Sequence, residues 1–310
     1  MRKRRKTIAM GILFIVLSFP AWTIEFEKVA IRVPERISRE LQRYDQARRL
    51  YWVGVNWVLY SSRINNRWES TIFDIRTGEV LQEFEESPYR INRVDGQMWF
   101  RSQDGSISMI PLERDPEDIN PPEPINLVYR RRGAMGGQST IQIRQIRPDG
   151  SVIDGEWYND RETARELGFI GDIGHGGILD MLPDGRTVLL AAQFTYIATI
   201  ENLRIVNLSR IEAKSDVALS RQGSFFVDDS RILTTTLYFG RGPVAGIDGP
   251  GVVYPVLMDF EGNVLAEFRS IEIPTVGYID YDSVRKQIVV LELTDDRYAS
   301  SEIAVYRLVE

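Results

Sequence analysis

The hydrophobic and polar positions of this 310-residue chain change character at residue 50. From there on, apolar and β-branched runs of about five to eight residues recur, and Gly, Asn or Asp bounds most of them. Runs of that length with turn residues at their ends are typical of strands in antiparallel hairpins. Such runs occupy residues 57–62, 70–75, 80–84, 97–102, 106–112, 140–146, 188–194, 203–208, 224–227, 232–238, 253–260, 264–268, 287–291 and 303–309. The pattern predicts an all-β body over residues 50–310.

Tight turns of one kind separate the predicted strands. Each turn places a glycine where a hairpin requires φ above zero. These glycines are Gly78, Gly105, Gly150, Gly185, Gly223 and Gly262. Residues 72–84 and 257–268 match in detail, with an apolar strand, an Asp, a Gly turn, Val-Leu and then Glu-Phe. Strands in groups of four at a period of about 45 residues are typical of a β-propeller.

We therefore predict a β-propeller of six blades, each of four antiparallel strands. Five or seven blades would also fit the length, and a β-sandwich with long inserts is the main alternative architecture. We expect the last strand, at residues 303–309, to close the ring by pairing with an early strand, because an open edge invites aggregation. A short helix is predicted at residues 161–167, capped by Asn159 or Asp160 and ended by Gly168.

The first 23 residues carry an export signal. Five basic residues at positions 2–6 precede a mostly apolar run at residues 7–22, with no acidic residue among them. This order is typical of a secretory signal, whose positive charges stay in the cytoplasm. The apolar run is shorter than the roughly 20 residues that span hydrocarbon as a helix. Ala21 and Thr23, which flank Trp22, form a poor cleavage site, so a retained signal anchor is favoured over a cleaved signal peptide.

An anchor would contact the membrane through residues 7–23 and hold the body at the periplasmic face of the inner membrane, whereas cleavage would release the body into the periplasm. Residues 24–49 connect this segment to the repeats. They begin with a predicted strand at residues 26–33, and after Pro34 the apolar Ile37, Leu41 and Tyr44 share one face of a helix. We interpret residues 24–49 as a spacer that lifts the body off the membrane; a solvated linker is the alternative.

Composition excludes several classes of protein. The chain has no cysteine, which excludes disulfides, thiol catalysis and thiolate metal sites. Beyond residue 23 it holds 33 basic and 44 acidic side chains, a net charge of −11. Such an acidic body argues against nucleic acid as a partner. Almost all of its positive charge is Arg, which we attribute to genomic base composition.

One histidine offers candidate chemistry. His175 is the only histidine of the chain, and the glycines on both sides of it let other groups approach its ring. Asp172 or Asp180 would orient that ring or raise its pKa. The histidine followed by an apolar-Pro-Asp-Gly hairpin and by residues 188–190 resembles the periplasmic arylsulfate sulfotransferase-like propellers. That resemblance covers about 20 residues and implies a histidine that carries a sulfuryl group, but the further histidines of that family are absent here.

Two other groups of residues are candidates for binding. Arg130, Arg131 and Arg132 form a positive patch that would bind an anionic ligand or partner, or would only be solvated. Acidic residues at positions 115–120, and Asp228 with Asp229, are candidate calcium ligands. Neither group has the spacing of a calcium loop, so solvated turn acids explain them better, and no cofactor is predicted.

More generally, the apolar strand, Asp, Gly turn and Val of the repeats resemble quinoprotein-like and lactonase-like propeller repeats. This resemblance implies the fold, and a fold does not give function. We favour a non-catalytic propeller of the bacterial cell envelope that binds a small-molecule ligand or a protein at its funnel. The alternative is a periplasmic enzyme of the arylsulfate sulfotransferase-like or lactonase-like type that uses His175 and nearby acids.

Overall fold

The computed structural model describes residues 24–42, 48–65, 67–86, 88, 90–92, 97–101, 107–111, 125–131, 140–147, 149, 151–168, 177–182, 184–191, 194–212, 218–238, 252–274, 279–294 and 301–310. The predicted membrane segment at residues 1–23, the loop that contains His175, and residues 115–120 lie outside this part of the chain.

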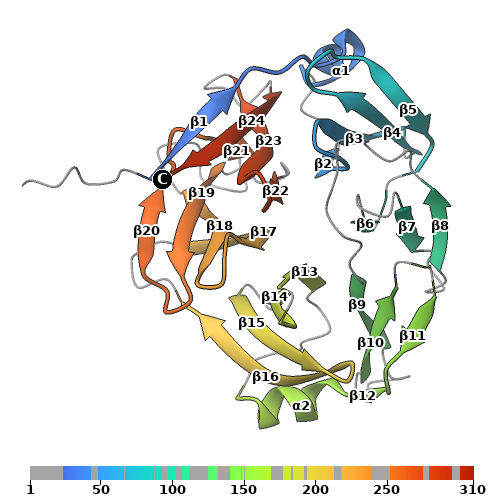
Figure 1. Cartoon of the computed structure of the whole chain (residues 1–310), viewed down its shortest axis with the longest axis vertical. Helices are drawn as coiled ribbons and strands as arrows, with labels where there is room; N and C mark the ends of the chain where they lie inside the picture. Colours follow the sequence, from blue (N-terminus) through green and yellow to red (C-terminus); the bar gives the residue numbers. More distant parts are fainter. Residues whose placement is uncertain are drawn as a thin grey trace, which may run out of the picture.

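The described strands form six sheets placed around a central axis (Figure 1). The first blade contains β2 (Arg48–Trp52), β3 (Trp57–Ile64), β4 (Arg67–Asp74) and β5 (Val80–Phe84). The second sheet contains β6 (Arg90–Asn92), β7 (Gln97–Arg101) and β8 (Ile107–Pro111). The third contains β9 (Ile125–Arg131), β10 (Thr140–Ile146), β11 (Val152–Asp154) and β12 (Tyr158–Asn159).

The remaining three sheets complete the ring. The fourth blade contains β13 (Gly177–Met181), β14 (Arg186–Ala191), β15 (Phe194–Glu201) and β16 (Arg204–Ile211). The fifth contains β17 (Ala218–Phe226), β18 (Arg231–Tyr238), β19 (Val252–Asp259), β20 (Val264–Glu267) and β21 (Ile273–Pro274). The last blade contains β1 (Glu25–Val29), β22 (Ile279–Asp282), β23 (Gln287–Leu293) and β24 (Ser301–Val309).

This arrangement is an all-β propeller, as the sequence predicts. Its pairings are antiparallel hairpins within a sheet, and β2, β13, β17 and β22 lie toward the axis while β5, β16 and β20 lie outside (Figure 1). Five of the sheets have the four or five strands of a full blade, and the sheet of β6–β8 has three among the described residues. The prediction of six blades with four strands each is therefore corrected to five full blades among the described residues.

Alternate residues of one strand enter two different cores, because successive side chains of a strand point to opposite faces. In β24, Ile303 and Val305 pack in a cluster with the first blade. Ala304, Tyr306 and Leu308 pack in another cluster with the fifth blade. Since a blade is covered on both faces, its strands are apolar on both faces, which explains why the burial of β24 is nearly continuous.

The ring closes non-covalently through the N-terminal strand. β1 pairs antiparallel with β24, from Glu25 opposite Val309 to Val29 opposite Val305. The C-terminal strand therefore pairs with an early strand, as predicted. Phe26 of β1 stacks edge-on against Phe268 with ring centroids 4.4 Å apart, which joins the closing strand to the core between the fifth and last blades.

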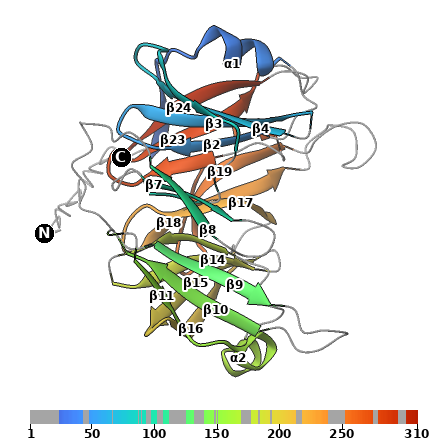
Figure 2. The same ribbon diagram turned by 90° about the vertical axis from the view of Figure 1, so that its right-hand side faces the viewer.

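Residues 24–42, which we call the strap, belong to the ring. After β1 the chain crosses to the first blade, where the short helix α1 (Glu35–Glu40) covers the sheet (Figures 1 and 2). Ile37 and Leu41 are buried between the first and last blades. This corrects the interpretation of residues 24–49 as a spacer or linker, because their described part packs on the body. Among the described residues, no helix has the length and apolar character needed to cross a membrane.

The second helix and three of the four described turn glycines follow the predictions, whereas Gly105 and Gly150 lie outside the described residues. α2 (Asp160–Glu166) begins where Asn159 Oδ1 accepts a hydrogen bond from the Glu162 backbone N–H, and Gly168 follows it with φ +71°. The turn glycines Gly78, Gly185 and Gly262 have φ between +76° and +86°. Gly223 differs: it lies inside β17, whose register with β18 shifts between Leu219 and Ser224, so the predicted turn is an irregularity within one strand.

Candidate functional site at the ring closure

The site residues predicted from the sequence fall mostly outside the described part of the chain. His175, Asp172 and Arg132 are among the undescribed residues. Asp180 lies in β13, and Arg130 and Arg131 lie at the end of β9; only the backbone of these three is described. β9 and β13 are neighbouring strands. The fold therefore brings the strands of Asp180 and of the arginine patch together, while the roles of these side chains stay predictions.

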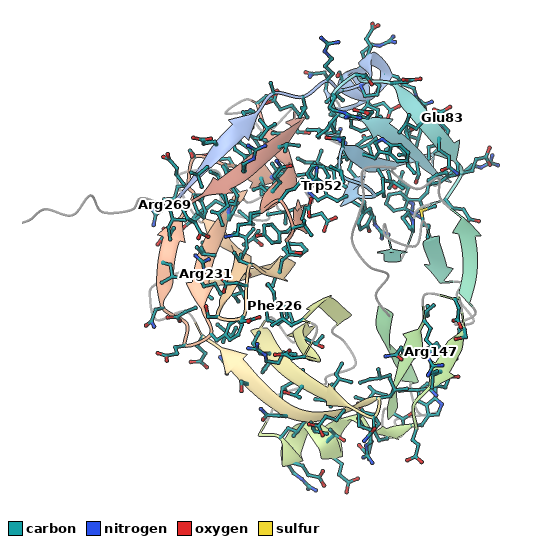
Figure 3. All side chains as sticks on the ribbon, viewed as in Figure 1. Trp52, Glu83, Arg147, Phe226, Arg231 and Arg269 are labelled. Atoms are coloured by element: carbon teal, nitrogen blue, oxygen red, sulfur yellow. The ribbon has the colours of Figure 1, made fainter. Side chains whose placement is uncertain are left out.

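The inner end of the ring closure carries a polar cluster between β2 and β22. Asp280 Oδ2 accepts a hydrogen bond from the Trp52 backbone N–H at 2.8 Å, and Asp280 Oδ1 accepts one from the Tyr281 N–H at 3.0 Å. Figure 3 shows Trp52 toward the inside of the ring, with Glu83 and Arg269 toward its outside. The carboxylate thus ties the innermost strands of two blades together.

An arginine completes this inner cluster. Arg285 pairs with the buried carboxylate of Asp282 and donates through Nη2 to the Gly54 carbonyl at 3.2 Å. Its guanidinium carbon also lies 5.1 Å from the ring centre of Trp52, within the range of a cation–π contact. Arg285, which pairs with Asp282, therefore contacts Gly54 and Trp52 and holds the last blade to the first.

The same arrangement, an Asp–Arg pair whose arginine reaches the neighbouring blade, recurs at other turns. Arg186 pairs with Asp184, two residues earlier, and reaches the next blade, where Nη1 donates to the Asp229 carbonyl at 2.9 Å. Arg231 pairs with Asp228 and reaches Glu310 at the end of the last blade. An Asp followed two or three positions later by Arg is visible in the sequence at these turns, but our sequence analysis attributed the arginines to base composition.

Of the candidate calcium ligands, the described Asp228 is bonded within its own turn. Asp228 Oδ1 accepts from the backbone N–H groups of Ser230 and Arg231, and Oδ2 accepts from Arg231 Nε. Partial burial alone would raise the pKa of the Asp228 carboxyl, but these hydrogen bonds outweigh it and lower that pKa. Both oxygens are thus engaged by the turn itself. No cluster of three or more potential metal ligands occurs among the described residues.

The strap is fixed by a second polar network, on the outside of the ring closure. Arg36 of α1 binds Glu40, Glu69 and Glu83 at 2.7–3.1 Å. The buried Arg48 donates through Nη1 to Ser301 Oγ at 2.8 Å and through Nη2 to the Glu40 carbonyl at 2.9 Å. One arginine thus joins α1, the first blade and the last blade.

The closing strand is held by a third cluster around Lys28. Its Nζ lies 2.7 Å from both Glu292 Oε2 and Glu302 Oε1, and the Tyr306 hydroxyl donates to Glu292 Oε1. Partial burial alone would lower the pKa of Lys28, but the bonds to the two glutamates outweigh it and raise that pKa. Burial, followed by the contact with Glu292, raises the pKa of Tyr306. The three charged side chains together carry one net negative charge at neutral pH.

Next to Lys28 lies a groove between the strap and the start of β24. Its volume is about 590 Å³, which is within the range of ligand-binding sites in proteins. Its lining is mixed polar and apolar, and Lys28 and Glu302 are its charged residues. The lining residues are Lys28, Val29, Ala30, Ile31, Val33, Ser38, Leu41, Gln42, Ser301, Glu302, Ile303 and Ala304. No sequence signal marked this groove, because residues 24–42 and 301–304 meet only when the ring closes.

Comparisons with known proteins add little to this description. No known protein family matches the chain, and no curated protein matches it in sequence. Among solved structures, a protein from Lactobacillus plantarum is 8% identical over 84% of this chain and 87% of its own, with a TM-score of 0.39. BamB from Moraxella catarrhalis is 9% identical over 83% of this chain and 84% of its own, with a TM-score of 0.36.

A third solved structure is similar at the same level. A puromycin-hydrolyzing peptidase from Mycobacterium tuberculosis is 13% identical over 90% of this chain, with a TM-score of 0.37, and this chain spans only 48% of its length. Likenesses this slight say nothing about function. The assignment of the propeller therefore rests on the arrangement of the sheets in this chain.

Proposed function

We propose that this protein is a non-catalytic β-propeller of the bacterial cell envelope that binds a protein partner or ligand. The observation that carries the proposal is the groove beside the strap, a cavity of about 590 Å³ with a mixed polar and apolar lining from residues 28–42 and 301–304. The ionisable side chains near it have structural partners: Lys28 joins three strands of the last blade, and Arg48 joins α1 and the first blade to the last. The described clusters therefore supply a rigid frame around a binding surface rather than a set of reacting groups.

The proposed location in the envelope follows from the N-terminal sequence. The basic cluster at positions 2–6 and the apolar residues 7–22 favour export with a retained anchor. The strap begins at Ile24, directly after that segment, and Ile24 packs against the core between the fifth and last blades. An anchor would thus hold the propeller close to the periplasmic face of the inner membrane. Fractionation of the full chain and N-terminal sequencing of the product test this part of the proposal.

A photo-crosslinking experiment tests partner binding. Benzoylphenylalanine is placed at Ala30, which is exposed at the groove, or at Ser209, which is exposed on the outer strand β16. We expect irradiation of cells to give a discrete adduct from position 30, which the Ser38→Trp substitution in the groove abolishes. Absence of any position-dependent adduct from either site would remove the support for a binding role.

The enzyme alternative is tested separately. Purified full-length protein and its His175→Ala variant are assayed with an aryl sulfate as sulfuryl donor, with a phenol as acceptor, and with a lactone. We expect no turnover by either protein. Turnover by the wild type that disappears in a folded His175→Ala variant would replace the binding proposal with an enzyme of the sulfotransferase-like or lactonase-like type.

A further inference from the structure

The outer edge of β24 is only partly paired. On its inner side, β23 pairs along the whole strand, from Leu293 opposite Ser301 to Gln287 opposite Arg307. On its outer side, β1 pairs only from Glu25 opposite Val309 to Val29 opposite Val305. The chain then leaves β24, and the Arg32 N–H binds the Ile75 carbonyl of the first blade at 2.6 Å. Among the described residues, no strand therefore lies beside residues 302–304 on the outer edge.

The register shows which backbone groups this edge presents. The Leu308 N–H points inward to the Lys286 carbonyl, whereas the Ser301 N–H points outward to the Leu41 carbonyl at 3.2 Å. Because the direction alternates along a strand, the N–H and C=O of Ile303 point outward, into the groove. No described residue forms a backbone hydrogen bond with Ile303 on that side. An unpaired strand edge is a template for another extended chain.

From these observations we infer that the groove binds a short extended segment of a partner protein, which adds to β24 opposite Ile303. This inference rests on the proposed binding function and names its mode. In strand addition, main-chain hydrogen bonds provide affinity and side-chain pockets provide specificity. The gap of residues 302–304 accommodates roughly three or four residues of an extended chain at about 3.3 Å each.

The lining determines the side chains that this segment needs. Ile31, Val33 and Leu41 form an apolar wall opposite Ile303, so the central residue of the segment is apolar. Glu302, with Glu292 and Lys28, leaves one net negative charge at the groove. In an antiparallel strand, the residue after the central one lies opposite Glu302, and a basic residue there neutralises that charge.

The strap itself shows the same pattern. If the β1 ladder continued, Ile31 would lie opposite Ile303 and Arg32 opposite Glu302. Instead, Arg32 is bound to the first blade. An apolar residue followed by Arg is therefore complementary to the open edge. The partner segment carries this pair, because the strap turns away before its own pair reaches the edge.

Fluorescence anisotropy with a defined peptide tests the inference on the full-length protein in detergent. The probe is a fluorescein-labelled peptide Val-Ala-Ile-Arg-Val-Ser with an amidated end. We expect saturable binding, a loss of about tenfold when the central Ile carries an N-methyl group that removes its donor, and a loss of about three- to fivefold when Glu replaces Arg. Hydrogen exchange at the Ile303 amide should slow when the peptide is bound.

Three tryptophan variants locate the binding site, and a fourth variant, at Glu302, tests its charge preference. Ala30→Trp and Ser38→Trp fill the groove from exposed positions and should each abolish binding, whereas Ser209→Trp on β16 should leave it unchanged. Glu302→Gln should remove the preference for Arg over Glu. Binding that is unaffected by N-methylation, or absent altogether, would overturn strand addition. The crosslink from position 30 would still support partner binding, so the failures of the two proposals are distinguishable.

Discussion

Two junctions between blades illustrate different ways to hold the ring together. The fourth and fifth blades follow each other in the chain, and between them lies a largely apolar core that includes Val188, Ile211 and Ile232. The last and first blades are far apart in the sequence. Between them the strap adds Ile37 and Leu41 to the core, and a buried contact of Arg48 and a partly buried contact of Asp280 cross the junction.

The difference shows what replaces a covalent connection. At the sequential junction, Arg186 crosses from a half-exposed position, and its pairing with Asp184 lies at the surface. At the closing junction, Arg48 is buried and bonds both Ser301 Oγ and the Glu40 carbonyl of α1, whereas the contact of Asp280 with Trp52 is partly buried. Polar contacts that need exact partners favour one arrangement of the two blades, which an apolar interface alone does not specify.

The largest expected effects come from the core of each junction. Ile37→Ala at the closing junction and Ile211→Ala at the sequential one each remove a buried side chain and should lower the free energy of unfolding by about 2–5 kcal/mol. Only Ile37→Ala should also release the strap. Urea unfolding measures the first effect, and hydrogen exchange over residues 24–42 measures the second. Equal strap protection in both variants would contradict the distinction.

A glycine substitution measures how tightly a sequential junction packs. A Cβ at Gly155, between the third and fourth blades, would lie 2.8 Å from Leu203 Cβ and 2.9 Å from the carbonyl oxygens of Ile143 and Leu203. Gly155→Ala should therefore destabilise the protein by about 1–3 kcal/mol. Leu203→Gly, which removes that Cβ, should rescue it only in part, because the two carbonyls remain.

Gly168→Ala is the control for backbone strain. A Cβ there would meet no atom within 4 Å, but its φ is +71°. Its cost should be about 1 kcal/mol and should not depend on Leu203. Thermal unfolding of the single and double variants separates the two causes. If Leu203→Gly rescued both glycine variants equally, steric crowding at Gly155 would not be the cause.

Removing an arginine from each junction sharpens the comparison of polar contacts. Arg48→Ala leaves Ser301 Oγ and the Glu40 carbonyl without their donor in a buried site, which should cost about 1–3 kcal/mol. Arg186→Ala removes a partly exposed pair and should cost less than about 1 kcal/mol. Urea unfolding at low and at high salt measures both, and only the Arg186 effect should shrink at high salt.

The smallest expected effect is a loss of stability in acid, at one turn of the first blade and one turn of the fifth. Hydrogen bonding from Arg76 lowers the pKa of Asp74 below 3.8, and Asp228 is shifted in the same direction. A lowered pKa in the folded state gives stability that is present above about pH 4 and is lost as the pH falls through the folded value. Asp74→Asn and Asp228→Asn should thus each cost less than about 1 kcal/mol at pH 7.

Urea midpoints at pH 7, 4 and 3 test this sign. The difference between the wild type and each Asn variant should narrow as the pH falls below 4. A difference that widened in acid would mean that the folded carboxyls bind protons more tightly than the unfolded ones, against the direction that their hydrogen bonds impose.

Local patterns in the sequence were sufficient for the repeat and not for the ring closure. The turns around Gly78 and Gly262 have matching sequences, and both have positive φ and a register shift beside the Asp. α2 follows from the capping of Asn159. These elements depend on residues close together in the chain, so local rules predict them.

The strap shows where local rules stop. Ile37 and Leu41 were correctly placed on one face of a helix, but nothing local specifies that this face packs between the first and last blades. The groove likewise joins Val29–Val33 to residues 301–304, and its open edge exists because β1 leaves β24 after Val29. Such a site depends on contacts between the two ends of the chain, which a single sequence does not reveal.

The closure by β1 also sets an order of events during folding. Lys28 and Glu292 are 264 positions apart, so β1 is synthesised long before β24, the strand with which it pairs. The entropy of closing so long a loop grows only slowly with its length, but non-local pairing makes folding slow. During that time β1 is an unpaired strand, and its acidic residues Glu25 and Glu27 then discourage pairing with other chains.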